Sequence, residues 1–153
     1  GNAKQATLLA RLLGLPVAAG NKQRLADDKV VISSIVGDVA GKKAIVLDDE
    51  IATGGSIVEI VSRLADHGCA EASIACTHGL FTGSAVERLT SATHISEVVS
   101  TNTVPAPANF PGLKTLSVAS LFAEAIARIH SGNSVSTLFN PAYAPPQDQE
   151  GLF

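Results

Sequence analysis

Residues Ala44 to Ser56 read AIVLDDEIATGGS, and this stretch decides the fold. Its first four residues form an apolar run with two β-branched members, which is typical of a short strand buried on both faces of a sheet. Asp48, Asp49 and Glu50 then place three carboxylates where that strand is expected to end. Small residues follow, and beyond them apolar side chains recur at helical spacing. The stretch therefore predicts a strand, an acidic turn, a small-residue loop and a helix.

That succession predicts a ligand site in the crevice beyond the carboxyl edge of a sheet. Free backbone amides and the positive end of the helix dipole favour a phosphate there. Ser56 and Glu59 also have the spacing of a capping box, in which they would only satisfy amides of the first helical turn. Both interpretations of Ser56 stay open. The loop lacks the GK[ST] ending of a Walker A element, so no lysine of that kind is supplied.

Composition favours one domain with an aliphatic core. The chain has 153 residues, of which 46% are hydrophobic and only 4% aromatic, with no Trp. Its net charge of -3 gives no basic surface for nucleic acid. No apolar run reaches the length of a membrane span and no signal peptide is visible, so a cytoplasmic location is expected. Cys69 and Cys76 are expected to be free thiols, because their number and spacing suit neither a disulfide framework nor a metal site.

Strand-like and helix-like segments alternate along the rest of the chain, which predicts an α/β domain with a parallel sheet and right-handed crossovers. Asn21–Lys29 is polar and charged, with no period of either kind, and 103–111 carries three prolines and is expected to be a loop. The residues from Asn140 to Phe153 are predicted to be a tail, so the domain is expected over 1–139. Helices are predicted at 3–13, 57–65, 84–89 and 118–129, and strands at 16–19, 30–36, 44–47, 72–76, 97–100 and 115–118.

The motif LDDEIATGGS resembles the phosphoribosyl-diphosphate-binding signature of type I phosphoribosyltransferase folds. With the other stretches, it resembles the carboxyl-terminal half of ribose-phosphate diphosphokinase, the phosphoribosyl diphosphate synthetase family. The resemblance implies a three-layer, parallel-sheet, type I phosphoribosyltransferase-like domain. The supporting stretches are NKQR (21–24), IVGDVAGKKAIVLDD (35–49), THGLFTGSAVERL (77–89), TNTVP (101–105) and SVSTLF (134–139).

The family resemblance implies transfer of the β,γ-diphosphoryl group of ATP to ribose 5-phosphate with Mg2+, which yields phosphoribosyl diphosphate. Asp48 and Asp49 match the acids that hold the ribose 2- and 3-hydroxyls, sometimes through a cation. A pair of carboxylates can accept hydrogen bonds from a vicinal diol. Ala52 stands where many bacterial relatives have Asp. The loop that matches the 5-phosphate site consists of Ala52, Thr53, Gly54, Gly55 and Ser56.

Two further groups of residues receive roles from the resemblance alone. Lys22 and Arg24 match the basic residues of the flexible catalytic loop, which would neutralise charge on the transferring group. Without the resemblance they would be interpreted as surface charges. Ser134, Ser136 and Phe139 match residues that line a regulatory phosphate and ADP site, and otherwise would form an ordinary polar segment.

The family enzyme has two halves of similar fold, and nothing in this chain corresponds to the amino-terminal one. The chain begins with Gly and contains no Met, which suggests a cut or trimmed product. We therefore expect it to bind ribose 5-phosphate without catalysing transfer alone, and to work within a dimer-based homo-oligomer such as a hexamer. The alternatives are a phosphoribosyltransferase, for which no hood over a base is visible, and a non-catalytic synthetase-associated regulatory protein.

Overall fold

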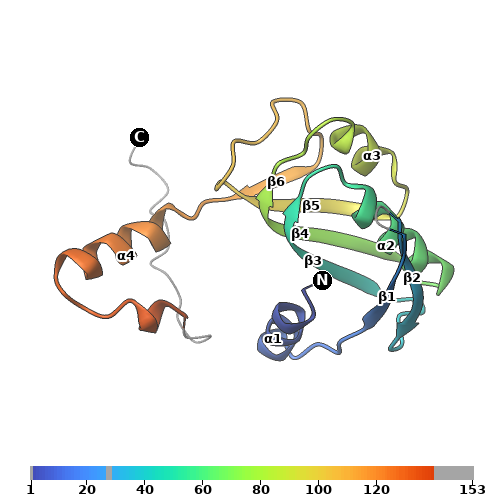
Figure 1. Ribbon diagram of the computed structural model, residues 1–153, viewed down its shortest axis with the longest axis horizontal. Coiled ribbons are helices and arrows are strands. Elements are labelled where there is room, and N and C mark those ends of the chain that lie inside the picture. Colours follow the sequence, from blue (N-terminus) through green and yellow to red (C-terminus); the bar gives the residue numbers. More distant parts are fainter. Residues whose placement is uncertain (1, 27–28, 140–153) are drawn as a thin grey trace. The chain divides into compact units, whose positions relative to one another are not determined.

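The structure, a computed structural model, describes residues 2–26 and 29–139, with only the backbone described over 21–34. It divides into two units, Gly1–Leu116 and Ser117–Phe153. The first unit contains a four-stranded parallel sheet in the order β3-β4-β5-β6 (Figure 1). The strands are β3 (Lys43–Ile51), β4 (Glu71–Gly79), β5 (Ile95–Thr101) and β6 (Leu113–Leu116). The predicted α/β class with a parallel sheet is confirmed.

Helices α2 (Gly55–Asp66) and α3 (Ala85–Ser91) follow β3 and β4, respectively, and bury their apolar sides. Because α2 has apolar residues three and four positions apart, one side of it faces the core. The core is mainly aliphatic, as predicted, and the buried thiols Cys69 and Cys76 are free. Its largest fully buried side chains are Ile51, Ile57, Ile74 and Leu89.

The first unit begins with α1 (Ala3–Leu13), at the bounds that the sequence predicts. The helix ends at Gly14, whose φ of 65° is the left-handed conformation that glycine adopts readily. Next come β1 (Ala19–Ala26) and β2 (Lys29–Val36), an antiparallel pair that forms a separate two-stranded sheet.

Two predictions for this region are wrong. The predicted strand at 16–19 begins only at Ala19, and most of the irregular segment predicted over Asn21–Lys29 lies in β1. A hairpin ladder is made by backbone groups, so a polar stretch without a side-chain period can still join it. The register of β1 on β2 shifts twice, between Asn21 and Lys22 and between Arg24 and Ala26.

The second unit contains α4 (Ala119–His130) and the short 3-10 helix η1 (Ser136–Phe139). The sequence predicts α4 to within one residue. No residue of α4 is buried, although the helix has an apolar stripe. The exposed members of the stripe are Leu121, Phe122, Ile126 and Ile129. Among the described residues, no helix combines the length and the apolar character that crossing a bilayer requires.

Candidate functional site

The three acids lie inside β3 and not in a turn after it. The prediction that the strand ends before Asp48 is wrong, because β3 continues to Ile51. Its neighbour β4 continues as well, and pairs Glu50 with His78 and Ile51 with Gly79. Ladder hydrogen bonds thus keep an acidic segment extended, which short-range sequence preferences do not predict.

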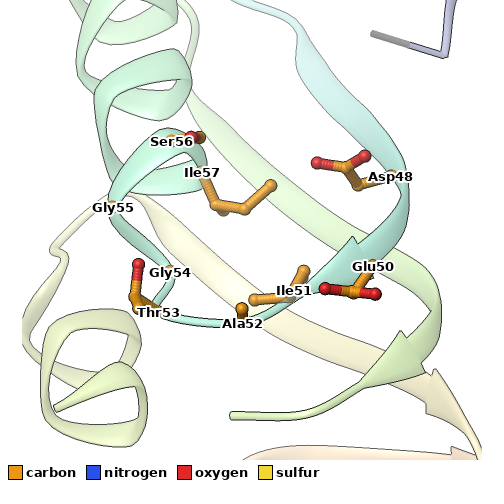
Figure 2. A pocket seen from close by; sticks show the side chains of 9 residues that line it. All are labelled: Asp48, Glu50, Ile51, Ala52, Thr53, Gly54, Gly55, Ser56 and Ile57. Atoms are coloured by element: carbon orange, nitrogen blue, oxygen red, sulfur yellow. The ribbon is translucent and has the colours of Figure 1, made fainter. Parts of the chain in front are cut away.

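Alternation along the strand separates the acids. Asp48 and Glu50 line an open cleft of about 170 Å³, whereas Asp49 is not among its lining residues. The remaining lining residues run from Ile51 to Ile57, across the loop and into the first turn of α2. Figure 2 shows the Asp48 carboxylate on the strand side of this cleft and Ser56 on the helix side. The structure thus brings Asp48 together with the predicted phosphate loop.

The loop turns into α2 through a glycine. Gly54 is the N-cap residue, with a φ of 74°, and no side chain caps the helix. The capping-box interpretation of Ser56 and Glu59 is therefore wrong: Ser56 is the second helical residue, two positions after the N-cap. The first-turn amides have no carbonyl one turn earlier to bind. Within the described part of the chain, no acceptor is found for the amides of Gly55, Ser56 and Ile57 at this end of the cleft.

A second segment supports the loop from behind, and the sequence analysis missed this role. The amides of Leu80 and Phe81 donate to the Ile51 carbonyl at 3.0 and 3.1 Å, and the amide of Thr82 donates to Ala52 at 2.8 Å. The turn is tight: a Cβ at Gly79 would lie 2.3 Å from Phe81 Cε2, and Phe81 has a φ of 44°. Phe81 is held there by an edge-to-face contact with Phe110 at 5.0 Å. In the sequence, the glycine two residues before Phe81 was the feature that could have indicated this tight turn.

Asp48 and Asp49 titrate as a coupled pair, and the structure separates their pKa values. Burial, followed by a hydrogen bond with Asp49, raises the pKa of Asp48. The same hydrogen bond lowers the pKa of Asp49, as do nearby backbone amides, and His78 adds a smaller favourable charge. The two shifts therefore have different main causes: burial for Asp48, and hydrogen bonding for Asp49. As pH falls, Asp48 is expected to take up its proton before Asp49 does.

Polar groups from β4 and β5 continue this edge of the sheet. Cys76 lies opposite Asp48 in the ladder and Ser100 lies opposite Cys76. Burial raises the pKa of the Cys76 thiol, which keeps it neutral. His78 lies near the end of β4, and its Nδ1 is 2.9 Å from Thr103 Oγ1, so a hydrogen bond holds this side chain.

The two predicted catalytic residues lie in the hairpin of β1 and β2. Lys22 and Arg24 lie in β1, paired with Ile32 and Val30, but their side chains lie outside what the structure describes. Their catalytic role stays a prediction. In the described part of the chain, no group of three or more His, Cys, Asp or Glu residues could hold a metal ion.

The predicted regulatory residues gather in the second unit. Ser134 Oγ lies 2.7 Å from Ser136 Oγ, and the Ser136 amide also donates to Ser134 Oγ. Arg128 of α4 fixes the segment by donating to the Ser134 carbonyl at 3.2 Å and to Thr137 Oγ1 at 2.8 Å. Phe139 is 83% exposed. The two serines are brought together, while their regulatory role is untested.

A family model described as phosphoribosyl synthetase-associated domain matches residues 3–140. The chain belongs to this family. A ribose-phosphate pyrophosphokinase of Caldanaerobacter subterraneus is 45% identical over 141 residues, which cover 91% of this chain and 44% of the relative. A Streptomyces coelicolor protein assigned to the same enzyme is 54% identical over 142 residues, covering 92% of this chain and 45% of that protein.

A solved structure agrees with these sequence relatives. The crystal structure of phosphoribosylpyrophosphate synthetase from Mycobacterium smegmatis aligns with a TM-score of 0.76 and 36% identity, covering 86% of this chain and 42% of that one. The chain thus spans less than half the length of the synthetases it matches. The family resemblance stated from the motifs is confirmed.

Proposed function

We propose that the chain is the ribose 5-phosphate-binding half of a ribose-phosphate pyrophosphokinase. One observation carries this proposal: the cleft sets a carboxylate at the end of β3 against free amides at the start of α2. The amides suit the 5-phosphate, and carboxylates accept hydrogen bonds from the ribose hydroxyls. A ligand with an anion at one end and a diol at the other matches both sides.

The full reaction would transfer the diphosphoryl group of ATP to ribose 5-phosphate. In this scheme the present chain holds the acceptor sugar, and the carboxyl-terminal position of the half stays a prediction. Lys22 and Arg24 would neutralise charge on the transferring group. Mg2+ binds through one or two carboxylates together with substrate phosphates, so Asp48, which lines the cleft, would fit it without a larger cluster, whereas Asp49 does not line the cleft. ATP, the other half and a homo-oligomeric assembly are part of the same proposal.

The test is isothermal titration calorimetry of the 153-residue chain with ribose 5-phosphate, ribose and inorganic phosphate. Ribose 5-phosphate should bind more tightly than either fragment, because it alone reaches both sides of the cleft. Equal affinity for ribose 5-phosphate and inorganic phosphate would contradict a role for the acids in sugar recognition. No binding of any of the three would contradict the site.

A non-catalytic regulatory role is the second candidate, favoured by the wording "synthetase-associated" in the family description. The two candidates differ in Lys22 and Arg24, which a regulatory protein does not need for transfer. In a protein that joins this chain to the other half, transfer of diphosphate from ATP should require both residues. Transfer that persists in Lys22→Ala and Arg24→Ala would assign catalysis to other groups.

A further inference from the structure

Three successive carbonyls at the end of β3 and the start of the loop, those of Ile51, Ala52 and Thr53, accept hydrogen bonds from residues between 80 and 88. The Ile51 and Ala52 carbonyls accept backbone amides of the turn before α3, as described above. The third carbonyl, of Thr53, instead accepts a side-chain donor: Arg88 Nη1, at 3.0 Å. Arg88 lies on α3, so the last peptide of the loop is held from a different element through a side chain.

The direction of a carbonyl also fixes the direction of the N–H in the same peptide. In a trans peptide the carbonyl of one residue and the N–H of the next point in opposite directions. Because the Thr53 carbonyl points to Arg88, the Gly54 N–H points away from α3. Gly54 lines the cleft with the other residues of 51–57, so an N–H directed away from α3 can face the cleft. Among the described residues, no acceptor is found for it.

The Thr53–Gly54 peptide needs such an anchor. Gly54 has a φ of 74° and lacks a Cβ, so little in the local chain opposes a rotation of the peptide before it. A rotated peptide would place a carbonyl where the phosphate is expected. The hydrogen bond from Arg88 opposes that rotation.

The charge of Arg88 also stays uncompensated beside the loop. Within the described part of the chain, no carboxylate lies at ion-pair distance from Arg88. Its Nη1 lies 4.0 Å from the point that a Cβ of Gly55 would occupy, at the first residue of α2. A cation in this place favours an anion at the loop over an empty one.

We infer that Arg88 is a positioning residue for phosphate binding, which fixes the Thr53–Gly54 peptide with its N–H toward the cleft. The inference rests on the proposed ribose 5-phosphate site and adds a specific requirement to it. Arg88 acts here on the loop carbonyl, and not as a direct ligand of the phosphate.

The experiment compares Arg88→Ala and Arg88→Lys with the unsubstituted 153-residue chain. Calorimetry with ribose 5-phosphate should show an affinity loss of about tenfold in Arg88→Ala, the value of one charge-assisted hydrogen bond. Arg88→Lys keeps a charged donor and should recover part of it. In the ligand-free chain, the NMR resonance of the Gly54 amide should move in Arg88→Ala. Since Arg88 is exposed, both variants should fold, as circular dichroism would verify.

Arg63→Ala is the matched control. It removes the same charge from the last turn of α2, where Arg63 pairs with Asp66 at 3.6 Å. It should leave both the affinity and the Gly54 resonance unchanged.

Three results would overturn the inference, and they are distinguishable. If the unsubstituted chain binds and Arg88→Ala binds equally well, Arg88 has no role in the site. If the affinity falls while the Gly54 resonance stays in place, Arg88 acts on the anion directly and not through the peptide. If the unsubstituted chain does not bind ribose 5-phosphate, the proposed function fails first. Should Arg88→Ala not fold, Arg88→Lys carries the same two measurements, with a smaller expected loss.

Discussion

The loop side of the cleft presents backbone groups, whereas the acidic side presents side chains. From Thr53 to Ser56 the residues are small, and the donors are main-chain amides at the start of α2. Across the opening, Asp48 contributes a carboxylate (Figure 2), and its pKa is raised by burial and by the neighbouring Asp49. The loop side therefore depends on backbone conformation and free space, and the acidic side depends on charge and protonation.

This difference decides what kind of substitution each side tolerates. A backbone site loses little when a side chain is trimmed, but it fails when a new Cβ fills it or turns a peptide. At a carboxylate site, by contrast, the affinity for the ligand falls when the charge of the side chain is removed, even if its volume is kept. The predictions below test this division, beginning with the largest expected effect.

The largest effect on stability and binding is expected from Gly54→Val. Gly55→Val, at the next residue, serves as the comparison. Gly54 has a left-handed φ, and a Cβ there would lie 3.3 Å from Leu89 Cγ, so the free energy of unfolding should fall by roughly 1–3 kcal/mol. Apart from its chain neighbours and the backbone of its own helix, the described atom nearest to a Cβ at Gly55 is 3.9 Å away, so that variant should stay folded. Both should lose ribose 5-phosphate binding, measured by calorimetry beside thermal unfolding.

A folded Gly55→Val variant with normal affinity would contradict the loop side of the comparison. It would mean that the phosphate does not approach the backbone at the start of α2. Equal destabilisation by the two valines would instead contradict the special conformation of Gly54.

The next effect concerns Asp48→Asn and Asp49→Asn. Asp48 lines the cleft and Asp49 does not, so Asp48→Asn should weaken ribose 5-phosphate binding by about tenfold, and Asp49→Asn by less. The measurement repeats the titrations with 2-deoxyribose 5-phosphate, which lacks one hydroxyl and should show smaller losses. Equal losses for the two sugars would indicate a general electrostatic effect and not recognition of the diol.

A smaller effect is expected from pH. The pKa of Asp48 is raised above its ordinary value near 3.8, so the folded chain binds this proton more tightly than the unfolded chain. The stabilisation it gives is fully present below 3.8 and is lost as pH rises through the raised value. Asp49 has the opposite sign: its lowered pKa contributes stability above 3.8, which is lost as pH falls through the lowered value.

NMR titration of the two side-chain carboxyl carbons measures this order directly. Asp49 should lose its proton first as pH rises, and Asp48 second. In Asp49→Asn the hydrogen bond and charge that help to raise the Asp48 pKa are gone, so Asp48 should titrate at lower pH. An unchanged Asp48 titration in that variant would leave burial as its only cause.

The parts of the fold that the sequence predicts well are those set by neighbours along the chain. The α1 bounds at Ala3 and Leu13 follow from helical spacing and from the glycine that ends it. The sequence also predicts the strand, loop and helix around TGGS in the right order. These features need no knowledge of distant contacts.

What the sequence could not predict depends on pairing across the chain. The length of β3 is set by β4, which extends the ladder through the acids. The support of the loop by the turn before α3 and by Arg88 involves residues some 30 positions away, where no local period exists. Helices α2 and α4 each have 12 residues and an apolar stripe, yet α2 buries three residues and α4 none. Periodicity predicts a helix, but it does not identify what the helix packs against.

The smallest effect is expected from Ser56→Ala, which tests where the loop side ends. A capping serine replaced by alanine costs typically about 1 kcal/mol. Here no side chain caps α2 and Ser56 follows the first helical residue, so the free energy of unfolding should change by less than about 0.5 kcal/mol. Ser56 nevertheless lines the cleft, and its hydroxyl, which has no hydrogen-bond partner among the described residues, can donate to a phosphate. The affinity for ribose 5-phosphate should therefore fall severalfold while thermal unfolding stays the same. Glu59→Ala is the control, since the other member of a capping box should change neither quantity. A loss of stability in both variants would show that Ser56 and Glu59 form a capping box after all. An unchanged affinity in Ser56→Ala would show that the loop side recognises phosphate through its backbone alone.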